Sequence, residues 1–251
     1  MASQITGHHT AAATTTPPSQ HHRDFLSHLE TYLAKRDGVD KLLKITRYAT
    51  KLLLASSLLP ETLPLNRRLK SFESSVGVSR KAFRLGKFIQ NVNALRRSVR
   101  SDDDCTCNFL VVLILSIIAH GGEGVYFFVE QFVWLVKAGL IDKKYGRRLG
   151  LVSAWAEFLG YFGSVGLKVI EIRRLNEERE RLGEKEEEEK EMAVRRKVLI
   201  KEVSVVQDLA DGFMALADIR NGNGRVFSPV ALAGAGLLSA LISTHKNWTS
   251  C

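Results

Sequence analysis

Apolar residues recur every three to four positions through the first hundred residues, a spacing typical of amphipathic α-helices. The first predicted helix begins at Asp24 and ends near Gly38, a residue type that often stops a helix. The second predicted helix covers 39–57, and Pro60 and Pro64 then bracket a turn. This part of the chain is therefore expected to be a series of short helices.

The stretch 65–97 is predicted to form a third helix with a narrow apolar stripe. The stripe consists of Leu65, Leu69, Phe72, Val76 and Phe83. A second apolar stripe lies on the opposite side and consists of Val78, Leu85, Ile89 and Val92. Gly77 is the predicted site of a bend, because glycine costs about 1 kcal/mol of helix propensity relative to alanine. A helix with two apolar faces can pack one of them inward and present the other elsewhere.

Longer apolar blocks in the second half of the chain predict membrane-embedded helices. Residues 109–119 carry no charge, and the apolar pattern continues to 136 past a glycine-rich stretch at 121–124. This block is either one span with a polar kink or two half-helices that enter a single leaflet. Residues 149–170 are long enough to cross a bilayer, and the uncharged block 226–244 is the strongest predicted span.

Small residues recur every four positions within the last two of these blocks. The two rows are Ala156, Gly160 and Ser164 in the first and Ala231, Ala235 and Ser239 in the second. Rows of this kind let two helices approach closely. We therefore expect them to mediate helix pairing and self-association.

The pattern as a whole predicts an all-α protein, with an N-terminal helical region that carries a basic amphipathic helix, followed by membrane-embedded helices. Five regions are expected. They are a disordered tail at 1–22, a cytosolic amphipathic helical region at 23–100, membrane-associated helices at 101–170, a charged linker or helix at 171–225, and a C-terminal transmembrane helix with a short tail at 226–251.

Positive charge is concentrated in the stretch that carries the apolar stripe. Residues 66–100 hold ten basic residues and one acid, Glu73, so their net charge of +9 equals that of the whole chain. An apolar stripe edged by cations suits a helix that lies flat on an anionic membrane. The predicted lipid-binding residues are Leu65, Leu69, Phe72, Val76 and Phe83 in the stripe and Arg67, Arg68, Lys70, Arg80, Lys81, Arg84 and Lys87 around it. The alternative is a soluble helical bundle in which the stripe is core and the cations are solvated.

The positive-inside tendency places the first hundred residues in the cytosol, because Arg96, Arg97 and Arg100 immediately precede the first apolar block. Two arrangements of the later blocks stay open. Crossings at 149–170 and 226–244 would return the C-terminus to the cytosol. Alternatively, 109–129 spans the membrane and 149–170 lies flat on it.

Catalytic and metal-binding chemistry is not expected. The sequence has no phosphate-cradling glycine loop and no nucleophile motif, so we predict neither an enzyme nor a cofactor. Cys105 and Cys107 have no further ligands nearby, so no metal site is predicted. The charge is not accompanied by a nucleic-acid-reading motif, so nucleic acid is not an expected partner. Three acids among apolar residues, which could line an ion path, are Glu123, Glu130 and Glu157.

Two motifs resemble those of the peroxin-eleven family of peroxisomal membrane proteins, in a plant-like form. The first is Lys35-Arg36-Asp37-Gly38-Val39-Asp40-Lys41-Leu42-Leu43-Lys44, followed by Arg47-Tyr48-Ala49. The second runs from Phe72 to Phe88, where Ser79-Arg80-Lys81 leads into Arg84-Leu85-Gly86-Lys87. The match is strong over 35–95 and extends loosely from Asp24 to the C-terminus.

The resemblance implies a protein that shapes the peroxisomal membrane. Members of this family bind anionic phospholipid through the amphipathic helix, elongate peroxisomes, and promote their fission and proliferation. They form homo-oligomers, associate with paralogues, and help to recruit a dynamin-related fission GTPase and its membrane adaptor. The chain is accordingly expected to be integral to the peroxisomal membrane with both termini in the cytosol. The alternatives are a peroxisomal membrane channel for small metabolites and a passive adaptor that does not bend the membrane.

Overall fold

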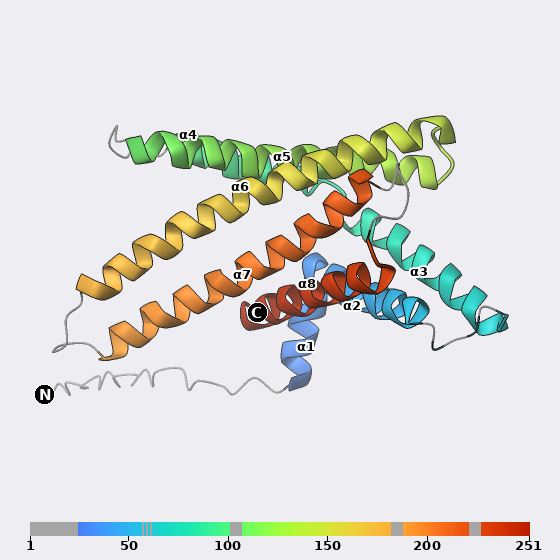
Figure 1. Cartoon of the computed structure of the whole chain (residues 1–251), viewed down its shortest axis with the longest axis horizontal. Coiled ribbons are helices and arrows are strands. Elements are labelled where there is room, and N and C mark those ends of the chain that lie inside the picture. Colours follow the sequence, from blue (N-terminus) through green and yellow to red (C-terminus); the bar gives the residue numbers. More distant parts are fainter. Residues whose placement is uncertain are drawn as a thin grey trace, which may run out of the picture.

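The structure, a computed structural model, describes residues 25–56, 58, 60, 62–100, 107–181, 188–220 and 227–251 (Figure 1). In chain order the helices are α1 (Phe25–Ala34), α2 (Arg36–Ala55), α3 (Pro64–Phe83), α4 (Phe88–Arg100), α5 (Cys107–Lys137), the short 3₁₀-helix η1 (Lys143–Tyr145), α6 (Gly146–Arg181), α7 (Glu188–Arg220) and α8 (Pro229–Thr249). The described residues form helices and turns without a β-strand, which confirms the expected all-α class. The predicted tail at 1–22 lies outside the described residues.

The boundary between α1 and α2 lies at Lys35, so the predicted helix stop at Gly38 is wrong. Gly38 is instead a buried residue in the first turn of α2. A β-carbon at this position would collide with the backbone carbonyl of Tyr32 in α1. The glycine therefore lets two consecutive helices meet closely, and it does so without ending either of them.

The predicted third helix is two helices, and the break is not at the predicted bend. The chain turns at 84–87, where Gly86 has a φ of +71°, a conformation that glycine adopts readily. Gly77 lies buried inside α3. A β-carbon on Gly77 would approach Arg47 Cζ of α2 to 3.0 Å, so the missing side chain makes room for that guanidinium group.

Helices α5 and α6 form an antiparallel pair whose contact surface is built from glycines. α5 runs without interruption through the glycine-rich stretch at 121–124, so the half-helix alternative is wrong. A β-carbon on Gly122 would lie 2.7 Å from the backbone nitrogen of Gly160, and one on Gly163 would lie 2.5 Å from the backbone nitrogen of Ala119. These glycines bring two backbones together.

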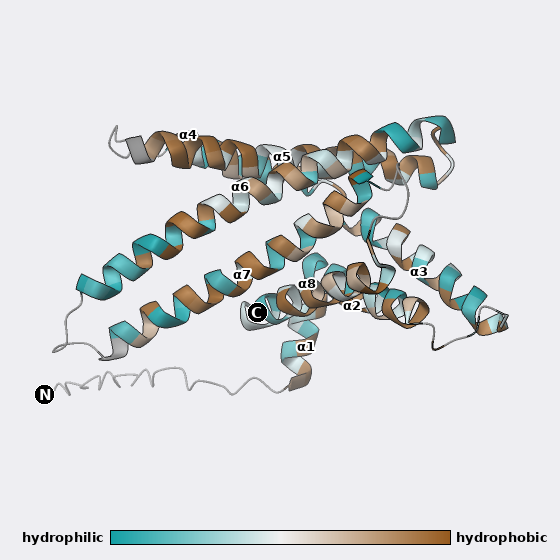
Figure 2. Ribbon diagram, in the orientation of Figure 1, coloured by the Kyte–Doolittle hydropathy of each residue, from teal (hydrophilic) through white to brown (hydrophobic). Residues whose placement is uncertain are grey.

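The remaining helices complete a bundle in which the N-terminal and C-terminal parts of the chain lie side by side (Figure 1). α6 extends to Arg181 and α7 begins at Glu188, so most of the charged segment at 171–202 is helical. α8 packs along α2, and the ring of Tyr48 occupies the place where Gly236 has no side chain. Figure 2 shows apolar residues along much of α5, whereas the distal end of α6 is hydrophilic.

Within the described residues, one helix is long and apolar enough to cross a membrane, namely Phe109–Lys137 in α5. The block at 226–244, which the sequence favoured, places five residues of α8 inside the protein. They are Ala233, Gly236, Ser239, Ala240 and Ser243. A crossing by this block therefore stays a prediction, and α5 becomes the stronger membrane candidate.

Two neighbouring glycines in α5 allow a matched test of the α5–α6 contact. We expect Gly122→Ala to lower the free energy of unfolding by about 1–3 kcal/mol, because its methyl group would overlap the backbone of α6. The control is Gly121→Ala, since no described atom lies within 4 Å of the point that its methyl group would occupy. The control should raise the stability by up to ~1 kcal/mol through helix propensity. Denaturant titration in a mild detergent measures both, and equal effects would contradict the close α5–α6 contact.

Candidate membrane-binding site

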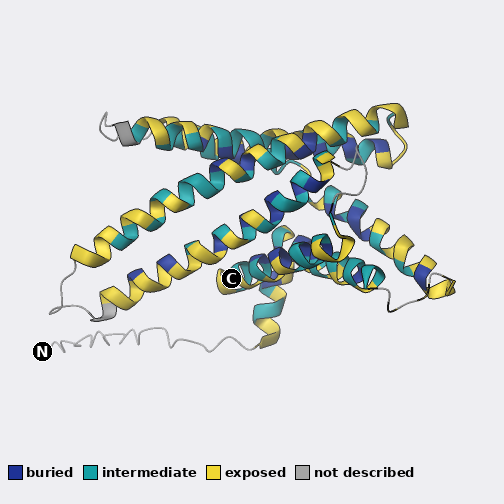
Figure 3. Ribbon diagram, in the orientation of Figure 1, coloured by how far each residue is buried: buried dark blue, intermediate teal, exposed yellow. Residues whose placement is uncertain are grey.

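The predicted lipid-binding residues fall into two groups that face opposite ways. The outward group includes Leu65, Phe72 and Phe83, whose exposed fractions are 50%, 48% and 38%. The cations Arg67, Arg68 and Lys70 are also exposed, and Leu69 is half-buried. Figure 3 shows this outer half of α3 largely in the exposed colour.

The inward group comprises the remaining members of the predicted set. Val76 and Arg80 are buried, with exposed fractions of 6% and 5%, so in this structure neither reaches the surface. Lys81, Arg84 and Lys87 are half-buried. In this structure acids of other helices hold four of the seven predicted cations, namely Arg80, Lys81, Arg84 and Lys87. Lipid binding by the predicted set stays a prediction.

Asp40 of α2 is the main partner of this inward group. Its Oδ1 accepts a hydrogen bond from Arg80 Nε at 3.0 Å and lies 3.5 Å from Arg84 Nε. The Asp40 side chain is almost completely buried. Burial alone would raise the pKa of Asp40, but Arg84 and Arg80 reverse the effect and hold that pKa well below its usual range.

Glu130 of α5 provides the second anchor for α3. It forms an ion pair with Lys81, and its Oε2 lies 3.8 Å from Arg84 Nη1. Arg84 Nη1 also donates a hydrogen bond to Tyr126 Oη at 2.7 Å. The C-terminal end of α3 is therefore held between α2 and α5 by charge.

The turn between α3 and α4 is fixed by the first turn of α2. Lys87 Nζ lies 3.1 Å from Asp37 Oδ1, and Arg36 Nη1 donates to the carbonyl of Leu85 at 2.7 Å. From α5, Gln131 Nε2 donates to the carbonyl of Arg84 at 3.3 Å. The family-like residues at 35–40 and 79–87 thus meet in space, which the sequence pattern alone did not reveal.

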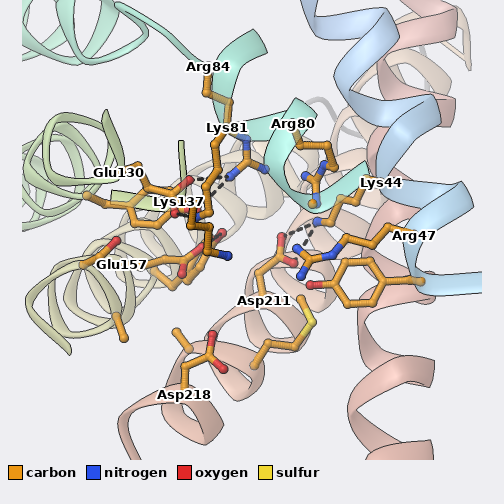
Figure 4. Close-up of a pocket in the computed structure, with 18 residues that line it drawn as sticks. Lys44, Arg47, Arg80, Lys81, Arg84, Glu130, Lys137, Glu157, Asp211 and Asp218 are labelled. Atoms are coloured by element: carbon orange, nitrogen blue, oxygen red, sulfur yellow. Dashed lines mark hydrogen bonds and ion pairs between the residues drawn. The ribbon is translucent and has the colours of Figure 1, made fainter. Parts of the chain in front are cut away.

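A charged cavity lies behind this contact. It has a volume of about 220 Å³, and among the described residues it is lined by six basic and four acidic side chains. Figure 4 shows Lys44 of α2 meeting Asp211 of α7 there. Lys44 Nζ lies 2.9 Å from Asp211 Oδ1 and donates to Ser239 Oγ of α8 at 2.6 Å.

Lys41 of α2 lines an adjoining cavity that it shares with Lys44 and Arg84. Burial, Lys87 and Lys44 together lower the pKa of Lys41 to about 7, and Asp40 offsets only part of the effect. Burial also lowers the pKa of Lys44, which Asp211 partly offsets. Because burial is the largest cause of both shifts, the lowered pKa values show that these two lysine side chains are largely removed from solvent.

The second apolar stripe is exposed on α4. Ile89 and Val92 of α4 and Leu85 of the preceding turn have exposed fractions between 46% and 56%, whereas Val78 of α3 is half-buried. The opposite side of α4 packs antiparallel along α5, since Phe88 contacts Phe128 and Ser116 Oγ donates to Ser98 Oγ at 2.7 Å. The structure therefore places the α4 part of the predicted second stripe on the outside of the α4–α5 pair.

Metal ligands are not assembled in the described part of the chain, where no three His, Cys, Asp or Glu side chains come together as a possible site. Cys105 and the side chain of Cys107 lie outside the described residues. The prediction that no metal is bound is not tested by this structure.

Comparison with known proteins decides the family. The model of the peroxisomal biogenesis factor 11 family matches residues 26–248. The chain belongs to this family. Peroxisomal membrane protein 11A of Arabidopsis thaliana is 56% identical over 241 residues, which cover 91% of this chain and 94% of that protein. Peroxisomal membrane protein 11-3 of Oryza sativa subsp. japonica is 54% identical, with 91% of each chain covered.

Membership in the peroxisomal biogenesis factor 11 family confirms the resemblance read from the motifs at 35–49 and 72–88. A more distant relative, human peroxisomal membrane protein 11A, is 31% identical over 105 residues, which cover 41% of this chain and 40% of that protein. No solved structure matches the chain.

The buried carboxylate of Asp40 yields a stability prediction. Asp40→Asn should lower the free energy of unfolding by about 3–5 kcal/mol at neutral pH, because it leaves Arg80 and Arg84 buried without their counter-charge. Because the folded-state pKa is lowered, this stabilisation is complete above about pH 4 and is lost as the pH falls further. Denaturant titration across the acid range measures the difference between the two proteins.

The control is Asp142→Asn, which changes an exposed aspartate that pairs with Lys144. Exposed ion pairs contribute about 0–1 kcal/mol to the free energy of unfolding, so this variant should lose little stability. A similar loss of stability in both variants, or a loss for Asp40→Asn that is independent of pH, would contradict the role given to Asp40.

Proposed function

We propose that this protein shapes the peroxisomal membrane, elongating peroxisomes and promoting their fission and proliferation. It is embedded through α5 and inserts the outer edge of α3 into the cytosolic leaflet. The observation that carries this proposal is the apolar row on α3 that the folded chain leaves uncovered. Leu65, Phe72 and Phe83 lie in this row, and exposed Arg67 and Arg68 are on the same helix.

The chemistry of this edge fits the boundary between lipid headgroups and acyl chains. Large apolar side chains enter the acyl region to a depth of about 5–10 Å, while arginines bind phosphates above it. Material inserted into one leaflet alone expands that leaflet and so favours curvature. The exposed apolar stripe of α4 lies next along the chain and extends the same kind of surface.

The paired helices α5 and α6 support the membrane location. Their outward faces carry an extensive set of exposed apolar side chains. The set is Leu110, Val111, Ile114, Ile117, Val125, Phe128 and Phe132 on α5 and Leu151, Val152, Trp155, Leu159, Phe162 and Val169 on α6. An apolar surface of this extent marks an interaction site in a folded protein, and hydrocarbon is the partner that matches a long, largely apolar helix such as α5.

The named relatives support the same location, since they are called peroxisomal membrane proteins. Partnership with paralogues, a dynamin-related GTPase and its membrane adaptor belongs to this proposal as well, as do the cytosolic termini and the absence of catalysis. Self-association through the small-residue rows needs revision, because Gly160 packs against Gly122 and Ser239 binds Lys44 within one chain.

A substitution on α3 tests the proposed function. Phe72→Glu combined with Phe83→Glu in the full chain should abolish tubulation of acidic proteoliposomes, because charged side chains cannot enter the acyl region. Both phenylalanines are exposed, so the fold should be retained. Electron microscopy of proteoliposomes at matched protein density measures the effect.

The matched control is Leu26→Glu combined with Leu33→Glu, which adds the same charge at exposed apolar positions of α1. This control should tubulate like the unmodified protein. Tubulation that survives in the α3 variant, or that is lost equally in the α1 variant, would overturn the role of α3.

A channel for small metabolites is the second candidate, and the charged cavity favours it. Glu130 of α5 and Glu157 of α6 both line this cavity, and α5 is the candidate membrane helix. Intramembrane acids that face a polar interior often mark ion pathways. If the channel is real, purified protein should conduct in planar bilayers and Glu157→Gln should reduce the conductance severalfold. Conductance that is absent, or unaffected by this substitution, would remove this candidate.

A further inference from the structure

Three of the cations that the sequence analysis assigned to lipid phosphates are already neutralised inside the protein. Arg80 and Arg84 bind Asp40, and Lys81 and Arg84 bind Glu130. A cation cannot bind a carboxylate of its own chain and a phosphate of the membrane with full strength at once. The two carboxylates are therefore competitors of the membrane for the same helix.

We propose that Asp40 and Glu130 form a carboxylate latch that holds α3 against the protein, and that an anionic lipid surface opens it by exchanging headgroup phosphates for these two acids. The inference rests on the proposed function and adds a control step to it. In the closed state, α3 offers the membrane Leu65, Phe72 and Phe83. In the open state it also offers Val76, Arg80, Lys81 and Arg84.

The hydrogen bonding of the latch is incomplete, which favours exchange. Asp40 Oδ2, Arg80 Nη2 and Glu130 Oε2 are buried without a hydrogen-bond partner among the described residues. Buried polar groups that lack partners destabilise the state that contains them. Phosphate oxygens can accept from all the donors of a guanidinium group, so the membrane offers Arg80 what Asp40 does not.

The backbone allows α3 to move while its neighbours stay in place. α4 is fixed along α5, whereas Figure 1 shows α3 projecting away from that pair. The two helices join at 84–87, where Gly86 adopts a positive φ. Apart from its chain neighbours, no described atom lies within 4 Å of the position a Gly86 β-carbon would take, so the turn has space around it. Rotation about the turn would have to break the polar contacts of Lys87 with Asp37 and of Arg36 with the Leu85 carbonyl.

The order of events follows from the exposed residues. The outer edge of α3, with exposed Arg67 and Arg68, meets an acidic surface first. The surface then raises the local concentration of phosphate groups beside the latch, and the inner cations leave their carboxylates. The full insertion of α3 would therefore depend more steeply on the anionic lipid content of the membrane than the first contact of α3 with the membrane does.

Chemical crosslinking of the unmodified full chain tests whether the latch opens. A water-soluble carbodiimide couples a lysine amine to a carboxylate that it contacts, so it should join Lys81 to Glu130 while the latch is closed. In phosphatidylcholine proteoliposomes, mass spectrometry should detect this product. Inclusion of phosphatidylserine should lower its yield by roughly tenfold if the latch opens in most molecules. The internal reference is the Lys201–Glu171 pair, which links α6 and α7 and should couple equally in both lipids.

A variant tests the consequence for membrane shaping. Glu130→Gln keeps the size of the side chain but removes the charge that holds Lys81 and Arg84. This variant should tubulate acidic proteoliposomes at a protein density roughly tenfold lower than the unmodified chain, because a larger fraction is already open. The matched control is Glu171→Gln, an exposed glutamate outside the latch, which should behave like the unmodified chain.

The outcomes separate this inference from the proposed function. If the Lys81–Glu130 yield is the same in both lipids, the latch does not open and the inference fails, even where the unmodified chain tubulates. If the yield falls but no variant tubulates, the latch stands and the membrane-shaping function fails. A Glu130→Gln protein that folds and is no more active than Glu171→Gln also overturns the latch.

Discussion

The structure depends on the neutralisation of one strongly basic helix by two distant carboxylates. Without Asp40 and Glu130, three cations of α3 would lie beside Lys41 and Lys44 in an interior that already disfavours positive charge. Charges of one sign cannot be packed together away from water unless they are paired. The position of the C-terminal end of α3 between α2 and α5 depends on this pairing.

The same pairing sets the energy scale on which the membrane must act. Removing a buried counter-charge costs about 3–5 kcal/mol. Each cation near an anionic surface gains ~1 kcal/mol, and the three inward cations Arg80, Lys81 and Arg84 would gain together with the newly inserted Val76. Because these magnitudes are similar, lipid composition can decide which state is populated. A much stronger latch would never open, and a much weaker one would leave α3 detached in every membrane.

The sequence predicted the elements of this design but not their orientation. Helical periodicity identified the apolar stripe, and motif similarity identified the family. The inward orientation of the Arg80 and Lys81 side chains could not be predicted from helical periodicity, because their partners lie 40 and 49 residues away in the chain. A helical wheel shows which residues share a face, yet it contains no information on what covers that face. The role of the glycines could not be predicted from the sequence either. Gly38, Gly77 and Gly122 weaken an isolated helix, but in the folded chain they allow neighbouring helices to pack closely.

The packing of α4 explains why the lipid-dependent step is assigned to α3 and not to α4. α4 lies antiparallel along α5 through Phe88 and Ser98, so it cannot leave that position without breaking the contact with the candidate membrane span. α3 is held on α5 by the ion pair of Lys81 with Glu130 and by the hydrogen bond from Arg84 to Tyr126. Charge-based contacts respond to the ionic character of a nearby surface, whereas apolar contacts do not. A helix that must sense anionic lipid is therefore better fixed by ion pairs than by hydrophobic packing, and the division of 64–100 into α3 and α4 separates the sensing part from the anchored part.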